Sequence, residues 1–314
     1  MVAENAIEVS GLTKRYGTVT ALDGVSFRVG RGELFGLIGP DGAGKTTLFR
    51  LLTTLLVPDA GFAAVDGFDT VRDYRRIRER VGYMPGRFSL YPDLSVEENL
   101  AFFAALFGVE IRDNYELIAP IYSQIEPFRT RRAGKLSGGM KQKLALCCAL
   151  VHRPSVLLLD EPTTGVDAVS RSEFWDMLSE LKRRGISILV STPYMDEARR
   201  CDRIALCNEG RVLGIDTPQG IVGTYGDPLY ALSGDDMYGL LTRARRAPGV
   251  RECYPFGEAH HLVATREFDA GRFVRELEAE GFAHVTIRPA EAGIEDVFIK
   301  LMHHLSLIHI SEPT

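Results

Sequence analysis

The sequence predicts an α/β protein built around a phosphate-binding loop, followed by a small α+β domain. The segment GPDGAGKTT at 39–47 fits G-x-x-x-x-G-K-[ST] and lies between an apolar run and leucines at helical spacing. A second apolar run, at 156–159, ends in two carboxylates. After about residue 226, where Gly, Asp and Pro cluster, the pattern changes to shorter elements. These three observations predict the fold class and a domain boundary, with domains at 1–225 and 226–304.

Composition limits the classes of protein to consider. The chain has 314 residues, 45% hydrophobic and 25% charged, which is ordinary for a globular protein with one large and one smaller domain. The net charge of -5 does not favour a nucleic-acid surface. Five cysteines without a C-x-x-C pair, and no apolar signal core at the N-terminus, suit a reducing cytosol. No stretch approaches the roughly 18 apolar residues of a membrane span, so any membrane part is expected in another chain.

The first third of the chain alternates between strands and helices. Alternation at 7–10 and 19–29 predicts an antiparallel β opening. The run at 34–38 predicts a buried strand, and the helix after the loop is expected to reach about residue 56. A strand at 62–65, a basic helix at 71–80 and a strand at 81–84 follow.

The middle of the chain is mainly helical. The sequence SVEE at 95–98 predicts a capping box that starts a helix running to about 108. Residues 111–135 are expected to be helical and more polar, and LSGGMKQ at 136–142 precedes a buried helix at 143–151. Beyond the run at 156–159, we expect a helix at 170–184, a buried strand at 186–191, a short helix at 196–200 and a hairpin across 208–210.

The C-terminal domain shows no catalytic constellation. Strands are expected around Tyr230, Cys253 and Leu262, a helix at 270–280, a strand at 285–287 and a last helix at 294–305. The pairs His260-His261 and His303-His304 are separated and lack carboxylate partners in sequence, so we interpret them as surface histidines rather than metal ligands. The tail LSLIHISEPT at 305–314 resembles a translated sequencing adapter and is treated as non-native.

The loop at 39–47 has the residue types that phosphate binding needs. Glycines let the backbone approach an anion closely, and free N–H groups at the start of the helix point at it. Lys45 adds a point charge for the outer phosphates, and the Thr46 hydroxyl can ligate Mg²⁺. The alternative, a chance glycine-rich turn, is disfavoured by the strand–loop–helix setting.

The carboxylates after the second apolar run are the usual partners of such a loop. A parallel strand delivers side chains at its carboxyl end to the same edge of the sheet. We expect Asp160 to hold Mg²⁺ through water and Glu161 to polarise the attacking water. The alternative is a strand that ends in two surface acids.

The segment LSGGMKQ supplies Ser and two Gly before a helix, which predicts a second anion site. Together with the loop at 39–47 it resembles the signature of ATP-binding-cassette (ABC) ATPases, and the resemblance covers roughly residues 5–225. It implies a P-loop NTPase with a RecA-like core, an antiparallel β subdomain and a helical subdomain that carries the signature.

The resemblance also implies partners and roles. Two cassettes would dimerise head to tail, with ATP and Mg²⁺ between the phosphate loop of one and the signature of the other. Tyr16 would stack on adenine, and Asp167 in the loop 165–167 would cross to the partner's site. Glu161 would be catalytic, and Thr46 and Asp160 would bind the metal. The remaining nucleotide-binding positions would be Gly39, Asp41, Gly42, Gly44, Lys45, Thr47, Ser137, Gly138 and Gly139, the last three toward the partner's ATP.

Three positions depart from the family pattern. Gly86 stands where the family has a Gln that ligates Mg²⁺, and Pro193 stands where it has a switch His. Neither residue offers a side-chain donor. Asp41 replaces the usual Asn, and its charge would oppose phosphate by about 1 kcal/mol. We interpret Gly86 and Pro193 as marks of a slow site in an asymmetric pair of cassettes.

The predicted function is therefore the ATP-binding, ATP-hydrolysing subunit of an exporter of drugs or lipophilic compounds. The motifs resemble the first cassette of tandem exporter ATPases, which implies a second cassette beyond about 305, and the domain after 226 resembles the accessory domain of drug-exporting members. Expected partners are a second cassette and membrane permease subunits, not nucleic acid, with a peripheral location at the cytoplasmic face of the inner membrane.

Two alternative functions make different predictions from the exporter subunit. In a regulatory module, ATP would close the dimer with little hydrolysis; Gly86 and Pro193 favour this, whereas the retained Glu161 argues against it. A soluble cassette that acts on ribosomes or DNA predicts basic arms or a long coiled-coil insertion, and the sequence has neither.

Overall fold

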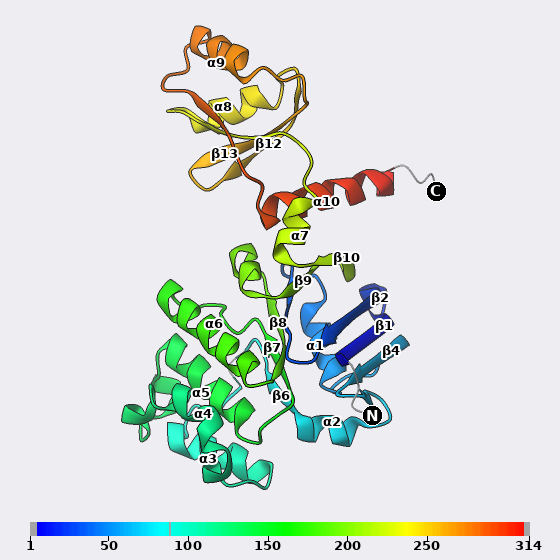
Figure 1. The fold of residues 1–314 in the computed structure, drawn as a ribbon, viewed down its shortest axis with the longest axis vertical. Helices are drawn as coiled ribbons and strands as arrows, with labels where there is room; N and C mark the ends of the chain where they lie inside the picture. The colour runs from blue at the N-terminus through cyan, green and yellow to red at the C-terminus, as the bar shows by residue number, and fades with distance from the viewer. Residues whose placement is uncertain (1–4, 88, 311–314) are drawn as a thin grey trace. The chain divides into compact units, whose positions relative to one another are not determined.

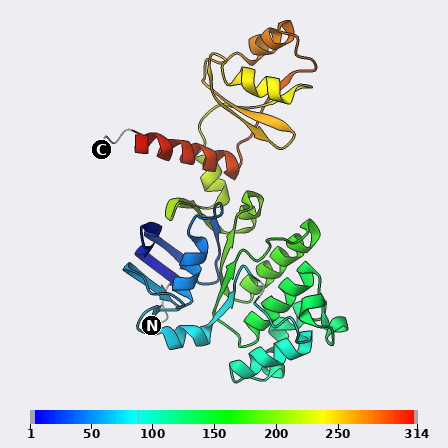
Figure 2. The ribbon, with the colours of Figure 1, turned by 180° about the vertical axis from the view of Figure 1, so that it is seen from behind.

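The computed structural model describes residues 5–87 and 89–310, with residues 304–310 described by their backbone alone. Of the predicted tail, 305–310 continues the last helix, and 311–314 lies outside the described residues. The chain divides into two units, Met1–Pro218 and Gln219–Thr314. Figures 1 and 2 show the elements of each unit from two sides. None of the described helices is long and apolar enough to cross a membrane.

The first unit is centred on a six-stranded sheet of order β10-β9-β3-β8-β7-β6. Its strands are β3 (Leu34–Ile38), β6 (Val81–Met84), β7 (Val156–Asp160), β8 (Ser187–Thr192), β9 (Arg203–Asn208) and β10 (Arg211–Asp216). Neighbours pair in parallel except for the β9–β10 hairpin, which the sequence predicts. Every residue of β3, β7 and β8 is buried, which explains their unbroken apolar or small-residue sequences.

The opening of the chain forms a second, antiparallel sheet of order β2-β1-β4-β5, as the alternation predicts. Its strands are β1 (Asn5–Tyr16), β2 (Val19–Gly30), β4 (Ala60–Val65) and the unpredicted β5 (Phe68–Asp69). One hydrophobic core joins this sheet to helix α1 (Lys45–Leu52) and to the central sheet. The expected extension of α1 to about 56 is wrong, because Thr54 adopts a left-handed conformation (φ 62°) just after the helix.

The helical part of the unit contains α3 (Val96–Leu106), α4 (Tyr115–Tyr122) and α5 (Gly138–Leu150), which Figure 1 shows packed side by side. The capping box at Ser95 and Glu98 is confirmed. The expected helix at 111–135 is instead broken into α4 and three 3-10 turns at 111–114, 126–128 and 133–135. Pro127 at the start of the second turn and Gly134 within the third suit short turns rather than a continuous helix. Helices α2 (Tyr74–Arg80) and α6 (Ala168–Arg183) complete the unit.

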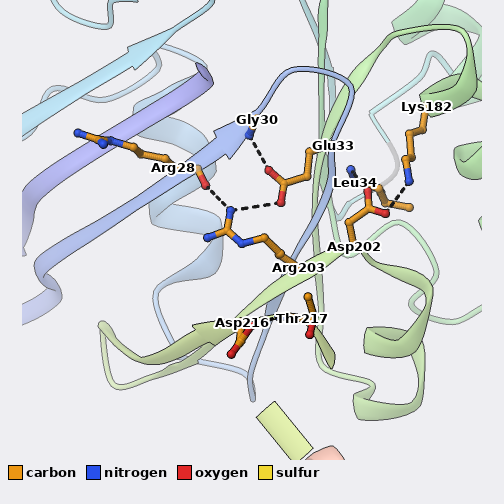
Figure 3. A network of polar contacts seen from close by, with 9 residues as sticks. All are labelled: Arg28, Gly30, Glu33, Leu34, Lys182, Asp202, Arg203, Asp216 and Thr217. Carbon is orange, nitrogen blue, oxygen red and sulfur yellow. Dashed lines mark hydrogen bonds and ion pairs between the residues drawn. The ribbon is translucent and has the colours of Figure 1, made fainter. Parts of the chain in front are cut away.

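A charged network fixes β3 at the end away from the phosphate loop (Figure 3). The Glu33 carboxylate lies 3.3 Å from Arg203 Nη1 at the start of β9. Asp202 accepts a hydrogen bond from Leu34 N at 2.9 Å and one from Lys182 Nζ of α6 at 2.5 Å. Because β9 and α6 both contribute contacts at the start of β3, the strand is anchored behind the loop that it carries.

The second unit is a βαββαβ arrangement. Its elements are β11 (Leu229–Ser233), α8 (Met237–Ala244), β12 (Val250–Phe256), β13 (Ala259–Ala264), α9 (Ala270–Ala279) and β14 (Thr286–Pro289). The sheet order β12-β13-β11-β14, all antiparallel, is that of the split βαβ fold. Helices α8 and α9 share one core with the sheet. A second apolar cluster includes Ile299 of α10 (Ile294–Ile310). A short helix, α7 (Pro218–Gly223), starts at the last residue of the first unit and otherwise belongs to the second.

The interpretation of His260 and His261 as surface residues is wrong, because their exposed fractions are only 5% and 7%. Consecutive residues of a strand point to opposite faces of the sheet, and here both faces are covered. His261 Nδ1 lies 2.6 Å from Oδ1 of Asp296 on α10, a carboxylate partner far away in sequence. His303 Nε2 likewise lies 3.1 Å from Glu252, and the side chain of His304 lies outside the description. The described residues contain no cluster of three or more His, Cys, Asp or Glu that could hold a metal ion.

Candidate active site

The loop at 39–47 connects the carboxyl end of β3 to the start of α1, and its glycines are required by their surroundings. Gly44, the N-cap of α1, has a φ of 90° and Gly42 a φ of 82°, a region that favours glycine. A Cβ on Gly39 would lie 2.1 Å from the carbonyl oxygen of Cys207, and one on Gly44 would lie 2.3 Å from that of Ala21. The loop therefore forms a backbone cradle that side chains would fill, which fits a phosphate group.

Lys45 supplies the positive charge of this cradle. Only 5% of the residue is exposed, and its ammonium group donates hydrogen bonds to the carbonyl oxygens of Gly39 and Pro40, both at 2.8 Å. The same nitrogen lies 3.1 Å from Oε1 of Glu161. The phosphate-loop lysine and the predicted catalytic glutamate thus belong to one site.

A cavity of about 610 Å³ opens at the loop, a size that suits a nucleotide. It brings together seven of the predicted site residues, namely Asp41, Gly42, Gly44, Lys45, Thr46, Thr47 and Glu161. Sequence reasoning missed the rest of the wall, which is made by residues 19–21 at the start of β2 and by Glu209 in the β9–β10 turn. Glu209 and Gly210 form the two-residue turn of the predicted hairpin, and both have positive φ (46° and 76°), as a type I′ turn requires.

Tyr16 lies at the end of β1 with 45% of its surface exposed and does not line that cavity. The ammonium group of Lys14 is 5.9 Å from the centre of its ring. An exposed aromatic ring close to residues 19–21 is available for stacking.

Asp160 ends β7 and is 2% exposed. Ser191, its neighbour across the β7–β8 pairing, donates a hydrogen bond from Oγ to Asp160 Oδ1 at 2.8 Å and accepts one from Glu161 N at 3.0 Å. Burial raises the pKa of Asp160, and hydrogen bonds with Thr46 and Ser191 oppose that rise. The hydroxyl of Thr46 and the carboxylate of Asp160 are hard oxygen donors and fit a Mg²⁺ ion. Sequence reasoning did not identify Ser191 as a site residue, although it is the last residue of a predicted buried strand.

Glu161 is held in an uncommon backbone conformation. Its φ of 50° lies in the left-handed region, which non-glycine residues avoid. The bond from its N–H to Ser191 Oγ helps to hold this conformation, and the side chain lines the cavity. Such conformations concentrate at functional sites.

Two of the three departures from the family pattern, Gly86 and Pro193, lie beside the carboxylates and beside the phosphate loop respectively. A Cβ on Gly86 would lie 3.0 Å from the carbonyl oxygen of Asp160 and 3.8 Å from Cβ of Glu161. Pro193 follows Thr192, whose carbonyl oxygen accepts a hydrogen bond from Gly39 N at 3.3 Å. Both positions therefore adjoin the site, and neither supplies a side-chain donor to it.

The signature residues lie at the start of α5. Ser137 is its N-cap and accepts a hydrogen bond from Met140 N at 3.3 Å. Ser137 and Gly138 are exposed, whereas Gly139 packs so closely on α6 that a Cβ would lie 2.6 Å from Oγ of Ser170. Asp167, the N-cap of α6, accepts a hydrogen bond from Ser170 N at 3.0 Å, which lowers the pKa of its carboxyl. The structure thus brings the signature next to the loop 165–167, and none of these residues lines the cavity of Lys45.

The parallel sheet, the glycine cradle with its lysine and the carboxylate at the end of the adjoining strand define a P-loop NTPase. Residues 22–164 match the family model described as "ABC transporter". The chain belongs to the ATP-binding proteins of the ABC transporter family, a class of ATPases, as its similarity over nearly the whole length of curated members shows.

Two kinds of relative illustrate this membership. The probable multidrug ABC transporter ATP-binding protein YbhF of Escherichia coli (strain K12) is 39% identical over 302 residues, which cover 94% of this chain and 52% of YbhF. The chain therefore spans about half the length of the YbhF proteins that it matches. The Nod factor export ATP-binding protein I of Paraburkholderia xenovorans (strain LB400) is 38% identical, with coverage of 95% of this chain and 97% of that protein. The corresponding protein of Burkholderia orbicola (strain AU 1054) is 42% identical, with coverage of 94% and 96%.

Solved structures agree with the fold. An ATP-binding subunit of an ABC transporter superposes with a TM-score of 0.63 at 30% identity, covering 69% of this chain and 91% of that one. The cbiO1 protein of Clostridium perfringens, described as part of the ABC transporter complex cbiONQ, gives a TM-score of 0.63 at 28% identity, covering 71% and 92%.

Proposed function

We propose that this chain is the ATP-binding and ATP-hydrolysing subunit of an ABC exporter of drugs or other lipophilic compounds. The observation that carries the proposal is the placement of Lys45, buried in a glycine cradle, 3.1 Å from Glu161 at the mouth of a nucleotide-sized cavity. The ATP-binding domain would span 1–225 and the accessory domain 226–304. The exporter class follows from the names of the relatives, which are multidrug and Nod factor export proteins.

Each site residue has a role that its contacts support. Backbone N–H groups of the loop 39–47 and the ammonium of Lys45 would hold the phosphates, and Tyr16 would stack on the base. Glu161 would accept the proton of the attacking water. Thr46 and Asp160 would hold Mg²⁺, which when bound neutralises phosphate charge. Ser137, Gly138 and Gly139, exposed or half-buried at the start of α5, would contact the nucleotide of a second cassette, and Asp167 would reach toward it.

The site is proposed to be the slow one of an asymmetric pair. Gly86 and Pro193 adjoin the carboxylates and the loop, and in neither place is there a side-chain donor for the reacting phosphate. The intact signature would complete the faster site of the other cassette. That cassette is supplied by the same polypeptide or by a separate chain, and relatives of both lengths exist.

Permease subunits are the proposed membrane partners, at the cytoplasmic face of the inner membrane. An apolar groove of about 590 Å³ lies between α2, β6, α3 and α5, and its lining includes Leu55, Leu106 and Phe107. Burial lowers the pKa of His152, which stacks on Phe107 in this groove, to about 4, so the ring is neutral there. A groove that is uncharged at this point and has exposed leucines at positions 55 and 106 suits an apolar segment of a partner.

The test is MgATP binding and single-turnover hydrolysis by the purified chain, with Lys45→Ala as the variant and Lys135→Ala, an exposed lysine, as the matched control. We expect wild type and the control to bind MgATP alike. Lys45→Ala should bind about 100-fold more weakly, a loss of roughly 3 kcal/mol. A wild-type chain that does not bind MgATP would overturn the proposal.

A regulatory module that closes on ATP with little hydrolysis is the second candidate, and Gly86 and Pro193 favour it. Glu161 argues against it, since a site without hydrolysis has no need of an acid in a strained backbone conformation. Steady-state ATPase rates with and without a second cassette separate the two. Acceleration by the second cassette supports the exporter subunit, and no acceleration supports the module.

A further inference from the structure

Glu197 is a buried carboxylate with no role assigned so far. It lies in the 3-10 turn Met195–Arg200 that follows β8, and only 4% of the residue is exposed. Its Oε2 accepts two hydrogen bonds from threonine hydroxyls, one from Thr192 at 2.5 Å and one from Thr163 at 3.1 Å. Burying a carboxylate is costly unless its charge is compensated, so this placement needs a reason.

The two threonines belong to different parts of the site. Thr163 lies in the loop between Glu161 and Asp167, and Thr192 ends β8 directly before Pro193. Thr192 Oγ1 also accepts a hydrogen bond from Tyr194 N at 3.0 Å, which fixes the turn after the strand. One carboxylate therefore ties the loop at 161–167 to the turn that carries Pro193.

The second oxygen of Glu197 faces helix α6. Oε1 is buried without a hydrogen-bond partner, and Nη1 of Arg171 lies 3.9 Å from it. The guanidinium group of Arg171 also lies 4.7 Å from the centre of the Tyr194 ring. The charge of Arg171 thus compensates the carboxylate from the helix that Asp167 caps.

We propose that Glu197 is a positioning residue that holds the loop 161–167 in the conformation that aims Glu161 into the cavity and presents Asp167. This inference rests on the proposed function for the roles of Glu161 and Asp167. The hydrogen bonds from Thr163 and Thr192 to Glu197 belong to the fold and do not depend on that function. Glu197 acts through Thr163 and does not contact the nucleotide.

Thr163→Val is the main variant, because it removes the hydroxyl while it keeps the side-chain shape. Glu197→Ala removes the carboxylate, and Glu197→Gln keeps an acceptor for both threonines. Thr70→Val is the matched control, since Thr70 is buried and its hydroxyl has no hydrogen-bond partner among the described residues. The full chain is compared by hydrogen–deuterium exchange, MgATP affinity and single-turnover hydrolysis.

We expect the amides of Thr164 and Val166, which close turns in this loop, to exchange about tenfold faster in Thr163→Val and Glu197→Ala, as the loss of a buried hydrogen bond predicts. Hydrolysis should fall about tenfold or more while MgATP affinity stays within about twofold, because the cradle of Lys45 is untouched. Glu197→Gln should retain most of the wild-type rate, and Thr70→Val all of it.

Unchanged exchange at these amides in Thr163→Val and Glu197→Ala would overturn the proposal, whatever the hydrolysis rate of the wild type. A uniform loss of thermal stability in the same variants, with no change confined to 161–167, would also overturn it. Failure of the wild type to bind MgATP would instead reject the proposed function. The exchange result would then still test whether Glu197 holds the loop 161–167.

Discussion

The ammonium of Lys45 and the carboxylate of Glu161 form an ion pair, with Nζ and Oε1 3.1 Å apart. The ammonium group of Lys45 therefore compensates the negative charge of Glu161. A phosphate that enters the cradle has to compete with Glu161 for this ammonium group. Neutralising Glu161 should consequently affect binding and hydrolysis in opposite directions.

Glu161→Gln keeps the size of the side chain, and glutamine has to adopt the same left-handed backbone conformation. We expect single-turnover hydrolysis to fall by about 100-fold or more, because the base is lost. The affinity for MgATP should stay the same or rise, since Lys45 is released from its pair. Glu258→Gln, at an exposed position of the second unit, is the control and should change neither quantity. Equal hydrolysis by Glu161→Gln and wild type would remove Glu161 from the catalytic role.

Asp160→Asn should stabilise the protein at neutral pH in the absence of Mg²⁺. Burial raises the pKa of Asp160 in the folded state, so the folded protein binds this proton more tightly than the unfolded chain does. The carboxylate therefore costs stability once the pH rises above the ordinary aspartate range of about 3.9. We expect the variant to melt roughly 2–4 °C higher at pH 7, the shift that about 1 kcal/mol gives for a domain of this size.

The gain from Asp160→Asn should shrink as the pH falls through the raised pKa of the folded state, and it should vanish well below about 3.9, where the wild-type carboxyl is protonated in both states. Thermal melts of both proteins across this pH range check the sign. A gain that grows on acidification would mean that the carboxyl is stabilised, not destabilised, by its surroundings.

Gly139→Ala should disturb the signature, because its Cβ would lie 2.6 Å from Oγ and 2.9 Å from Cβ of Ser170. We expect a loss of about 1–3 kcal/mol in the free energy of unfolding. Gly138→Ala is the control, since its Cβ has no contact closer than 3.5 Å. The double variant Gly139→Ala with Ser170→Gly removes both clashing atoms and should recover most of the loss in a denaturant titration. No recovery would show that the close approach of α5 to α6 is not the cause.

Gly86→Gln combined with Pro193→His restores the family residues in the slow site. We expect single-turnover hydrolysis by the chain alone to rise about tenfold or more, because two polar side chains return beside the reacting phosphate. The new glutamine has to shift its backbone slightly, since a Cβ at 86 would lie 3.0 Å from the carbonyl oxygen of Asp160. An unchanged rate, in a variant that still binds MgATP, would contradict the proposed asymmetry.

The sequence predicts the parts of this fold whose signals are local. The strand at 34–38, the loop at 39–47 and the carboxylates after 156–159 all lie where expected, because each combines an apolar run with a short chemical motif. The hairpin across Asn208-Glu209-Gly210 was predictable for the same reason. The cavity wall at 19–21 was not, because its residues carry no motif and reach the site only through the second sheet.

The polar residues that were misread or missed share one physical cause, which is a partner distant in sequence. His261 is buried because α10 covers that face of the sheet and brings Asp296 to its ring. Ser191 and Glu197 join the site because β8 lies beside β7 and the turn after β8 meets the loop at 161–167. Each of these contacts depends on strand order and helix packing, which periodicity along the chain does not contain.

The left-handed backbone of Glu161 has a consequence for anyone who engineers this protein. A glutamate in that conformation costs about 1–2 kcal/mol, and glycine would relieve the cost. Repeated rounds of selection for heat resistance alone should therefore replace this acid early, and the more robust descendants would be the inactive ones. A screen that rewards turnover alongside thermal tolerance would keep the glutamate and seek its improvements elsewhere in the chain.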